Sequence, residues 1–243
     1  MKIEGKNPVR ELLKTDATIE KVLIADKSND AELKTIHKMA RDLGIKVEFI
    51  DRRGLDKLSE TGHHQGVMAE YSDFKYCDLD EVIKLNRAAG KDILFVILDE
   101  VLDPHNLGSV IRVAECAGAS AVIIPSRRSA VVNETVVRTS AGATAYMPVV
   151  KVGNINQAIT NLKEQNIWVY AADMDGEAMY KSNLTGDIAL VIGGEGTGVH
   201  DLTRKLCDGI VSIPMYGKIN SLNASVSAGI VLYEAVRQRN FKK

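Results

Sequence analysis

The stretch IPMYGKINSLNASVSAGIVLYEA, residues 213–235, decides how the rest of the chain is interpreted. Ile213-Pro214-Met215 closes a short apolar run, and polar, turn-forming residues follow it up to position 220. A long apolar-periodic run then predicts the last helix, with Ser221 as its N-cap and Asn223 in its first turn. Because the N–H groups of a first turn have no helical partner, this turn can hold a polar ligand.

A second informative stretch is DEVLDPHNLGSVIRVAE, residues 99–115. Asp103-Pro104 is typical of a helix start, with Asp as the cap and Pro at the first helical position. Asn106, Ser109 and Arg112 then recur every three residues and predict an exposed polar ridge, while their apolar neighbours face the core. The same pattern also fits an ordinary amphipathic surface helix.

A third stretch, LVIGGEGTGV at residues 190–199, places a glycine-rich loop after an apolar strand. A dinucleotide-binding GxGxxG pattern starting at Gly194 requires a small residue at position 199, which is Val199. This spacing disfavours a nucleotide-dependent oxidoreductase. The glycines still predict close backbone approach to a ligand or to another segment, with Glu195 held against that ligand.

The pattern of helices and strands divides the chain into three parts. Residues 1–72 alternate helical and strand patterns and predict a small α/β domain, and residues 73–91 predict a linker carrying one short helix. Residues 92–243 alternate near-continuous apolar strands with helices, which indicates a mostly parallel sheet covered on both faces. All three stretches begin where such strands end, the place where ligands bind in these sheets.

Composition limits the kind of protein and the location of any nucleic-acid site. The 243 residues include 31 basic and 32 acidic residues, a net charge of −1, so any RNA site is local. The three cysteines form no CxxC pair and the five histidines have no metal-ligand spacing, so we expect neither disulfides nor a metal. No apolar run reaches membrane-spanning length and no secretion signal precedes the first domain, so we expect a cytoplasmic protein without membrane contact.

Taken together, the three stretches resemble the signature motifs of the SpoU (TrmH) family of RNA ribose 2′-O-methyltransferases. The resemblance extends to residues 5–9, GKNPV, and 63–67, HHQGV, which look like the family's accessory substrate-binding domain. It implies an α/β SPOUT-type fold whose C-terminal part forms a deep trefoil knot, preceded by a small ribosomal-protein-like RNA-binding domain. It also implies a homodimer, S-adenosyl-L-methionine as cofactor and a guanosine of 23S rRNA as the target.

The resemblance also assigns residues to roles. The matching catalytic positions are Asn106, Arg112, Glu195, Ser221 and Asn223. The matching cofactor positions are Gly193, Ile213, Met215 and Leu222. In the first domain, the candidate RNA contacts are Lys6, Asn7, Arg10, His63, His64 and Gln65.

Two questions remain open at this point. Arginine is a poor base, so we expect Arg112 to stabilise the developing alkoxide and hold an RNA phosphate, with Glu195 as the rival base. The substrate could instead be a tRNA ribose, or the chain could be a non-catalytic RNA-binding assembly factor of the same fold.

Overall fold

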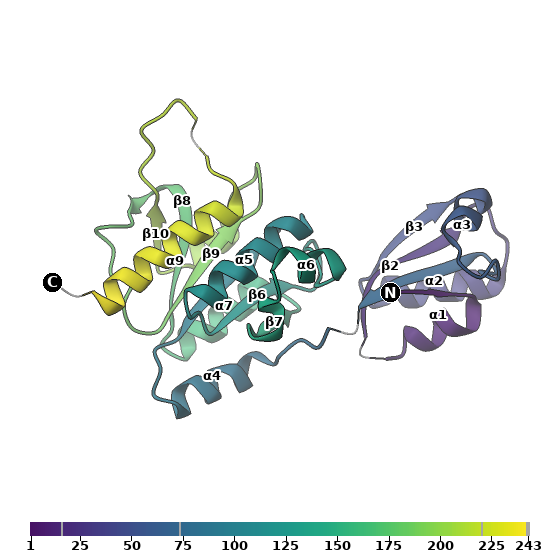
Figure 1. The fold of residues 1–243 in the computed structure, drawn as a ribbon, viewed down its shortest axis with the longest axis horizontal. Helices are drawn as coiled ribbons and strands as arrows, with labels where there is room; N and C mark the ends of the chain where they lie inside the picture. The colour runs from purple at the N-terminus through teal and green to yellow at the C-terminus, as the bar shows by residue number, and fades with distance from the viewer. Residues whose placement is uncertain (16, 73, 220, 242–243) are drawn as a thin grey trace. The chain divides into compact units, whose positions relative to one another are not determined.

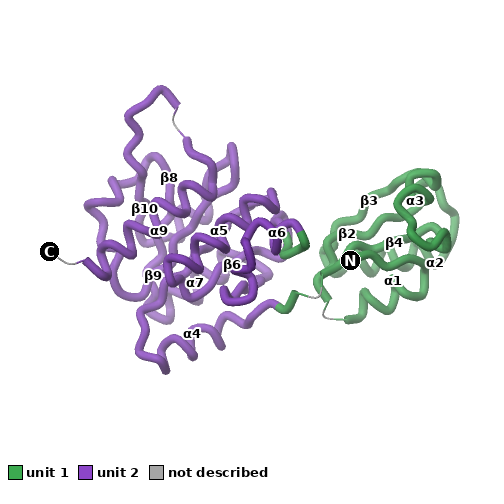
Figure 2. Tube along the Cα trace, viewed as in Figure 1, with its two compact units in different colours: residues 1–75, 131–134 green, residues 76–130, 135–243 purple. Residues whose placement is uncertain are grey.

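A computed structural model describes residues 1–15, 17–72, 74–219 and 221–241, and the chain divides into two units (Figure 2). The N-terminal unit comprises Met1–Lys75 with Val131–Glu134, and the C-terminal unit comprises Tyr76–Ala130 and Thr135–Lys243. Residue 73, where the predicted linker begins, and residue 220, in the predicted turn, lie outside the described residues. No helix among the described residues is long and apolar enough to cross a membrane.

The N-terminal unit is a four-stranded sheet in the order β1-β4-β2-β3 with helices on both faces. Among the described strands of this sheet, β2 and β3 pair in parallel, whereas β4 is antiparallel to both β1 and β2. Val22 and Ile24 of β2 pack with the buried residues of α1 and α2, whereas Leu23 packs with Leu55 of α3, as strand alternation requires. The elements are β1 (Lys2–Glu4), α1 (Lys6–Leu12), β2 (Thr18–Ala25), α2 (Ala31–Asp42), β3 (Lys46–Ile50), α3 (Arg52–Leu58) and β4 (Val67–Ser72).

The C-terminal unit is a six-stranded, fully parallel sheet in the order β10-β8-β9-β5-β6-β7. The predicted mostly parallel α/β sheet is therefore confirmed. The strands are β5 (Leu94–Asp99), β6 (Ala121–Pro125), β7 (Val149–Val152), β8 (Trp168–Ala178), β9 (Ile188–Gly193) and β10 (Gly209–Ser212). The helices are α4 (Leu79–Ala88), α5 (Pro104–Cys116), α6 (Glu134–Thr139), α7 (Ile155–Glu164), α8 (Asp201–Leu206) and α9 (Ala224–Asn240), with a 3-10 turn at Ala143–Ala145 (Figure 1).

Helix α4, which the sequence analysis placed in a linker, packs as part of the C-terminal unit. Val82 and Ile83 are buried in one core cluster with Phe95 and Ile97 of β5 and Ile159 of α7. The periodic apolar face of α4 is what holds it there, because burying such side chains stabilises the packed arrangement by about 1.5–3 kcal/mol each. Helices α5 and α9 pack against each other, and α9 also contacts β9.

The order of the strands creates a point where the chain direction across the sheet reverses. From β5 the chain continues to β6 and β7 on one side, whereas from β9 it continues to β10 on the other. Strands β5 and β9 pair in register from Leu94–Ile188 to Asp99–Gly193. Ligands in doubly wound sheets bind beyond the carboxyl ends of strands at such a switch point.

Candidate functional site

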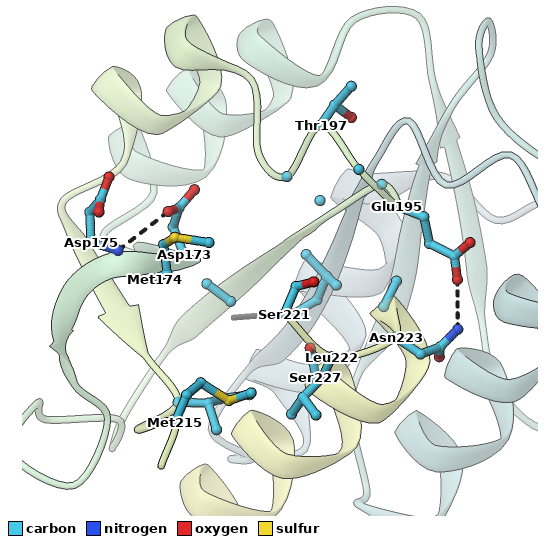
Figure 3. Close-up of a pocket in the computed structure, with 18 of the residues that line it drawn as sticks. Asp173, Met174, Asp175, Glu195, Thr197, Met215, Ser221, Leu222, Asn223 and Ser227 are labelled. Atoms are coloured by element: carbon cyan, nitrogen blue, oxygen red, sulfur yellow. Dashed lines mark hydrogen bonds between the residues drawn. The ribbon is translucent and has the colours of Figure 1, made fainter. Parts of the chain in front are cut away.

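A cavity of about 640 Å³ opens where β9 and β10 end, beside the middle of β8 (Figure 3). Cavities of this size suit a drug-sized or cofactor-sized ligand. The walls come from three parts of the chain: the middle of β8, the glycine-rich loop after β9, and the segment from β10 into α9. The lining residues used below are Asp173, Met174, Asp175, Gly193–Gly198, Ile213, Met215, Ser221, Leu222, Asn223 and Ser227.

Three predicted catalytic residues, far apart in sequence, meet at one edge of this cavity. Asn106 donates from Nδ2 to Oε1 of Glu195 over 3.0 Å. Asn223 donates from Nδ2 to the same Oε1 over 2.7 Å and to Oδ1 of Asn106 over 2.9 Å. The two amides therefore fix the Glu195 carboxylate, and Figure 3 shows Glu195 and Asn223 pointing toward each other.

Asn223 rather than Ser221 caps the last helix, so the predicted N-cap was wrong by two residues. The Oδ1 atom of Asn223 accepts hydrogen bonds from the N–H of Ser225 over 2.9 Å and of Val226 over 3.4 Å. Both residue types are good caps, and the hydrogen bonds decide between them because α9 begins at Ala224. Ser221 instead lies in the preceding segment, where it lines the cavity.

Helix α5 begins as predicted, with Asp103 accepting from the N–H of His105 and Pro104 in the first turn. The predicted exposed polar ridge is wrong at its first position, because Asn106 is only 6% exposed. Its amide avoids the cost of burial by hydrogen bonding to Glu195 and Asn223. Arg112 is exposed, does not line the cavity, and lies six residues further along α5, about 9 Å by helical rise.

The glycine-rich loop needs its glycines for backbone contact, as the sequence predicted. A Cβ on Gly194 would lie 2.4 Å from the carbonyl oxygen of Glu100, and a Cβ on Gly193 would lie 2.0 Å from the backbone of Gly198. Gly198 donates from its N–H to the carbonyl of Gly194 over 3.1 Å, which closes the loop that presents Glu195. The glycines thus serve chain-to-chain packing beneath Glu195.

All four predicted cofactor positions, Gly193, Ile213, Met215 and Leu222, line the cavity. The sequence analysis missed the opposite wall, Asp173-Met174-Asp175 in β8, which Figure 3 shows across the cavity from Glu195. Arg204 of α8 lies 3.5 Å from Asp173 and 3.4 Å from Asp175. The only available signal was the placement of polar residues directly after an apolar strand.

The lining combines apolar side chains with carboxylates. Met174, Ile213 and Leu222 offer surface for a flat aromatic ring, whereas Asp173 and Glu195 favour a ligand with positive charge. Among the described residues, no cluster of three or more His, Cys, Asp or Glu could hold a metal ion. At the C-terminal end of α8, burial chiefly raises the pKa of the Cys207 thiol to about 12, and a neutral thiol is a poor nucleophile.

The predicted RNA contacts of the N-terminal unit fall into two classes. Lys6 is paired with Asp30 at 2.5 Å and with Glu32 at 3.1 Å, and Arg10 donates to Asn7 over 2.7 Å. The hydrogen bond to Asp30 raises the pKa of Lys6, so its ammonium remains charged. These side chains are held in place on the surface by neighbouring polar groups.

The second class is the loop at residues 63–65, in which the adjacent histidines differ. His63 is exposed, whereas His64 is 3% exposed. The Nδ1 atom of His64 accepts from the N–H of Gly66 over 3.0 Å, so its Nε2 is the donor that faces Asp56 at 2.8 Å. Both ring nitrogens are therefore occupied within the unit. Gln65 accepts from the N–H of Lys6 over 3.1 Å and joins the two predicted RNA-binding segments.

The sequence matches two protein-family models that together cover most of the chain. Residues 93–233 match the SpoU rRNA Methylase family, and residues 2–77 match the model described as RNA 2′-O ribose methyltransferase substrate binding. The 23S rRNA (guanosine-2′-O-)-methyltransferase RlmB of Xanthomonas campestris pv. campestris is 44% identical over 239 residues, which are 98% of this chain and 96% of that protein. A putative TrmH family tRNA/rRNA methyltransferase, YacO of Bacillus subtilis, is 39% identical over 238 residues, covering 97% and 95%.

Solved structures agree with this result. The SpoU methyltransferase AviRb from Streptomyces viridochromogenes, in complex with AdoMet, superposes with a TM-score of 0.62 at 26% identity, covering 98% of this chain and 90% of that one. The A. aeolicus TrmH/SpoU tRNA modifying enzyme gives a TM-score of 0.56 at 26% identity, covering 65% of this chain and 84% of that one. With one family model spanning more than half of the sequence and close relatives spanning nearly all of it, the chain belongs to the SpoU rRNA Methylase family.

Proposed function

We propose that the protein transfers a methyl group from S-adenosyl-L-methionine to the ribose 2′-hydroxyl of a guanosine in 23S rRNA. The observation that carries the proposal is the contact of Asn106, Glu195 and Asn223 at the edge of a cofactor-sized cavity. The relative in Xanthomonas campestris, similar over nearly the whole chain, is named for this reaction. A solved relative binds AdoMet, the same cofactor.

The cavity fits the proposed cofactor in size and chemistry. Its volume of about 640 Å³ and its apolar residues Ile213 and Leu222 suit an adenosine group, and its carboxylates suit a sulfonium cation. When bound, S-adenosylmethionine supplies an already activated methyl group. The protein therefore has to bind, orient the ribose and stabilise charge, and orientation alone can contribute about 7 kcal/mol or more.

Within this scheme, Asn106 and Asn223 hold Glu195, and Ser221 and Asn223 lie where the ribose has to enter. Arg112 stabilises the 2′-oxygen as its proton leaves and holds an adjacent RNA phosphate, because a guanidinium donates two hydrogen bonds but does not accept a proton at neutral pH. Glu195 is the competing candidate for the base that removes this proton.

We propose a homodimer in which Arg112 acts at the partner's cavity. The exposure of Arg112, outside the cavity of its own chain, supports this arrangement. Val226 and Tyr233 are 48% and 49% exposed, and their spacing along α9 places them on one helical face that a partner could cover. Mixing an Arg112→Ala chain with an Asn106→Ala chain should restore part of the activity that each lacks alone, because one composite site would be intact.

Different stretches of the chain have different roles in the proposed function. Residues 1–72 hold RNA and residues 92–243 catalyse, and the stretch 73–91 between them contributes α4 to the core of the catalytic unit. The C-terminal segment passes through a loop as a deep trefoil knot, the arrangement that the resemblance to the SpoU family implies. The protein works in the cytoplasm, where ribosomal RNA is available to it.

A tRNA ribose is the second candidate substrate, because the Bacillus subtilis relative is named for tRNA or rRNA. The experiment that decides is transfer of a tritiated methyl group to naked 23S rRNA fragments and to tRNA, followed by nuclease mapping. Label on a guanosine ribose of 23S rRNA is the expected result. Label on tRNA alone would select the second candidate, and binding of RNA with no label on either would indicate a non-catalytic assembly factor.

A further inference from the structure

The glycine-rich loop that carries Glu195 is attached at both ends to the same two residues, Asp99 and Glu100, at the end of β5. At its start, Gly194 packs on the backbone of Glu100 so closely that an added Cβ would lie 2.4 Å from the carbonyl oxygen. At its end, His200 donates from its backbone N–H to Oδ2 of Asp99 over 2.9 Å.

The imidazole of His200 strengthens the attachment at the end of the loop. Its Nδ1 lies 3.1 Å from Oδ2 of Asp99, and its Nε2 lies 3.3 Å from Oε2 of Glu100. Asp99 is only 6% exposed, so this carboxylate depends on the groups around it for compensation. The ring therefore lies between two carboxylates, with one ring nitrogen toward each of them.

The backbone of Glu100, directly after β5, has an unusual conformation. Its φ angle is +58°, a left-handed conformation that is uncommon for a residue with a side chain. The conformation places its carbonyl beneath Gly194, while its carboxylate faces both His200 and, at 3.1 Å, Arg128. Such strain persists where surrounding contacts over-determine the backbone.

We propose that His200, whose ring lies between the carboxylates of Asp99 and Glu100, is a positioning residue that holds Glu195 against Asn106 and Asn223. The inference rests on the proposed function for its catalytic consequence. The loop between the two attachments both lines the cavity and presents Glu195, so release of the His200 end should weaken cofactor binding and slow turnover together. Arg128 takes part indirectly, through Glu100.

The test compares full-length variants at His200 with a nearby control. His200→Ala should raise the Kd for S-adenosyl-L-methionine about tenfold in calorimetry and lower kcat by a similar factor. His200→Arg keeps N–H donors that can face both carboxylates and should remain within about twofold of the wild type, whereas His200→Gln, with a single shorter amide, should not. Lys205→Ala, at an exposed position on α8, should leave all these values unchanged.

Hydrogen exchange of residues 194–199 gives a measurement that needs neither cofactor nor RNA. His200→Ala should accelerate exchange there, and His200→Arg should restore protection. If the wild type neither bound cofactor nor transferred methyl, the proposed function would fail while the exchange result could still stand. If His200→Ala left loop exchange and Kd unchanged, or His200→Arg behaved like His200→Ala, the positioning role would be wrong.

A double mutant separates positioning from general stability. In a Glu195→Gln background, His200→Ala should lower kcat little further, because the group that it positions has already been changed. A fully additive loss of kcat would contradict the proposal. Should His200→Ala unfold the chain, Asp99→Asn supplies the second variant, since it keeps the shape and an acceptor for the N–H of His200 but removes the charge. Normal loop protection and Kd in Asp99→Asn would likewise overturn it.

Discussion

Asn223 uses the two ends of one amide for two purposes: its Nδ2 donates to Glu195 over 2.7 Å, and its Oδ1 caps α9. Asn223→Asp should separate them. Aspartate caps helices as well as asparagine does, so thermal stability should change little. Turnover should fall at least tenfold, about 1.4 kcal/mol, because a carboxylate would face the acceptor oxygens of Glu195 and Asn106.

Asn223→Ala is the matched variant, since it removes both functions. Thermal unfolding should show a loss of about 1 kcal/mol from the missing cap, together with the loss of turnover. Equal thermal destabilisation by Asn223→Asp and Asn223→Ala would show that Asn223 does not stabilise α9 as its cap.

Arg112→Lys should reduce kcat by about a hundredfold, because lysine keeps the charge but loses the paired donors of the guanidinium. Single-turnover methyl transfer and RNA binding by filter retention measure the two effects separately. Nearly full turnover with unchanged RNA affinity would contradict the role given to Arg112. A pH–rate profile governed by a carboxylate, and abolished by Glu195→Gln, would assign proton removal to Glu195.

Gly194→Ala should destabilise the C-terminal unit by about 2 kcal/mol, because the new methyl group meets backbone rather than a movable side chain. Gly153→Ala is the control, as its added Cβ would have nothing within 4 Å. Trp168 is the single tryptophan of the chain and lies in this unit, so its fluorescence follows unfolding in urea. Equal urea midpoints for Gly194→Ala and Gly153→Ala would indicate that the glycine-rich loop moves freely over Glu100.

Glu4→Gln should change how the N-terminal unit responds to acid. Hydrogen bonds from Ser59 and then Thr61 lower the pKa of Glu4 from 4.5 to about 2. A lowered folded-state pKa contributes stability that is present above pH 4.5 and is lost as the pH falls toward 2. Across that window, hydrogen exchange in β1 and β4 should therefore show a steeper loss of stability for the wild type than for Glu4→Gln. Parallel profiles of stability against pH for the wild type and Glu4→Gln would mean that the Glu4 carboxylate contributes little to stability.

The two adjacent histidines of the N-terminal unit should give opposite phenotypes. His63→Ala should weaken binding to a 23S rRNA fragment while leaving stability unchanged, because the ring is exposed. His64→Ala should cost about 1–3 kcal/mol of stability, since it leaves Gly66 and Asp56 without their partner. Gel-shift titrations at two salt concentrations and thermal unfolding distinguish the cases. A stability loss for His63→Ala would argue against its assignment to RNA.

The sequence predicted the parallel sheet and the convergence of three segments, because apolar strand patterns and motif positions are local properties of the chain. It could not predict the burial of Asn106, since the partners that satisfy its amide lie 89 and 117 residues away. It chose Ser221 over Asn223 as the cap because both residue types cap equally well and only the hydrogen bonds decide. No sequence motif predicted that Asp173 and Asp175 would form a wall of the cavity.

The convergence of distant segments also sets when the protein can first act during its own synthesis. Asn106 and Glu195 are made before Asn223, and Glu195 gains its shorter amide contact only when Asn223 is in place and α9 packs against α5. A nascent chain that ends before α9 can contain a folded N-terminal unit and most of the sheet, yet lacks one wall of its cavity. The proposed methyl transfer therefore requires that α9 has been made and has packed against α5.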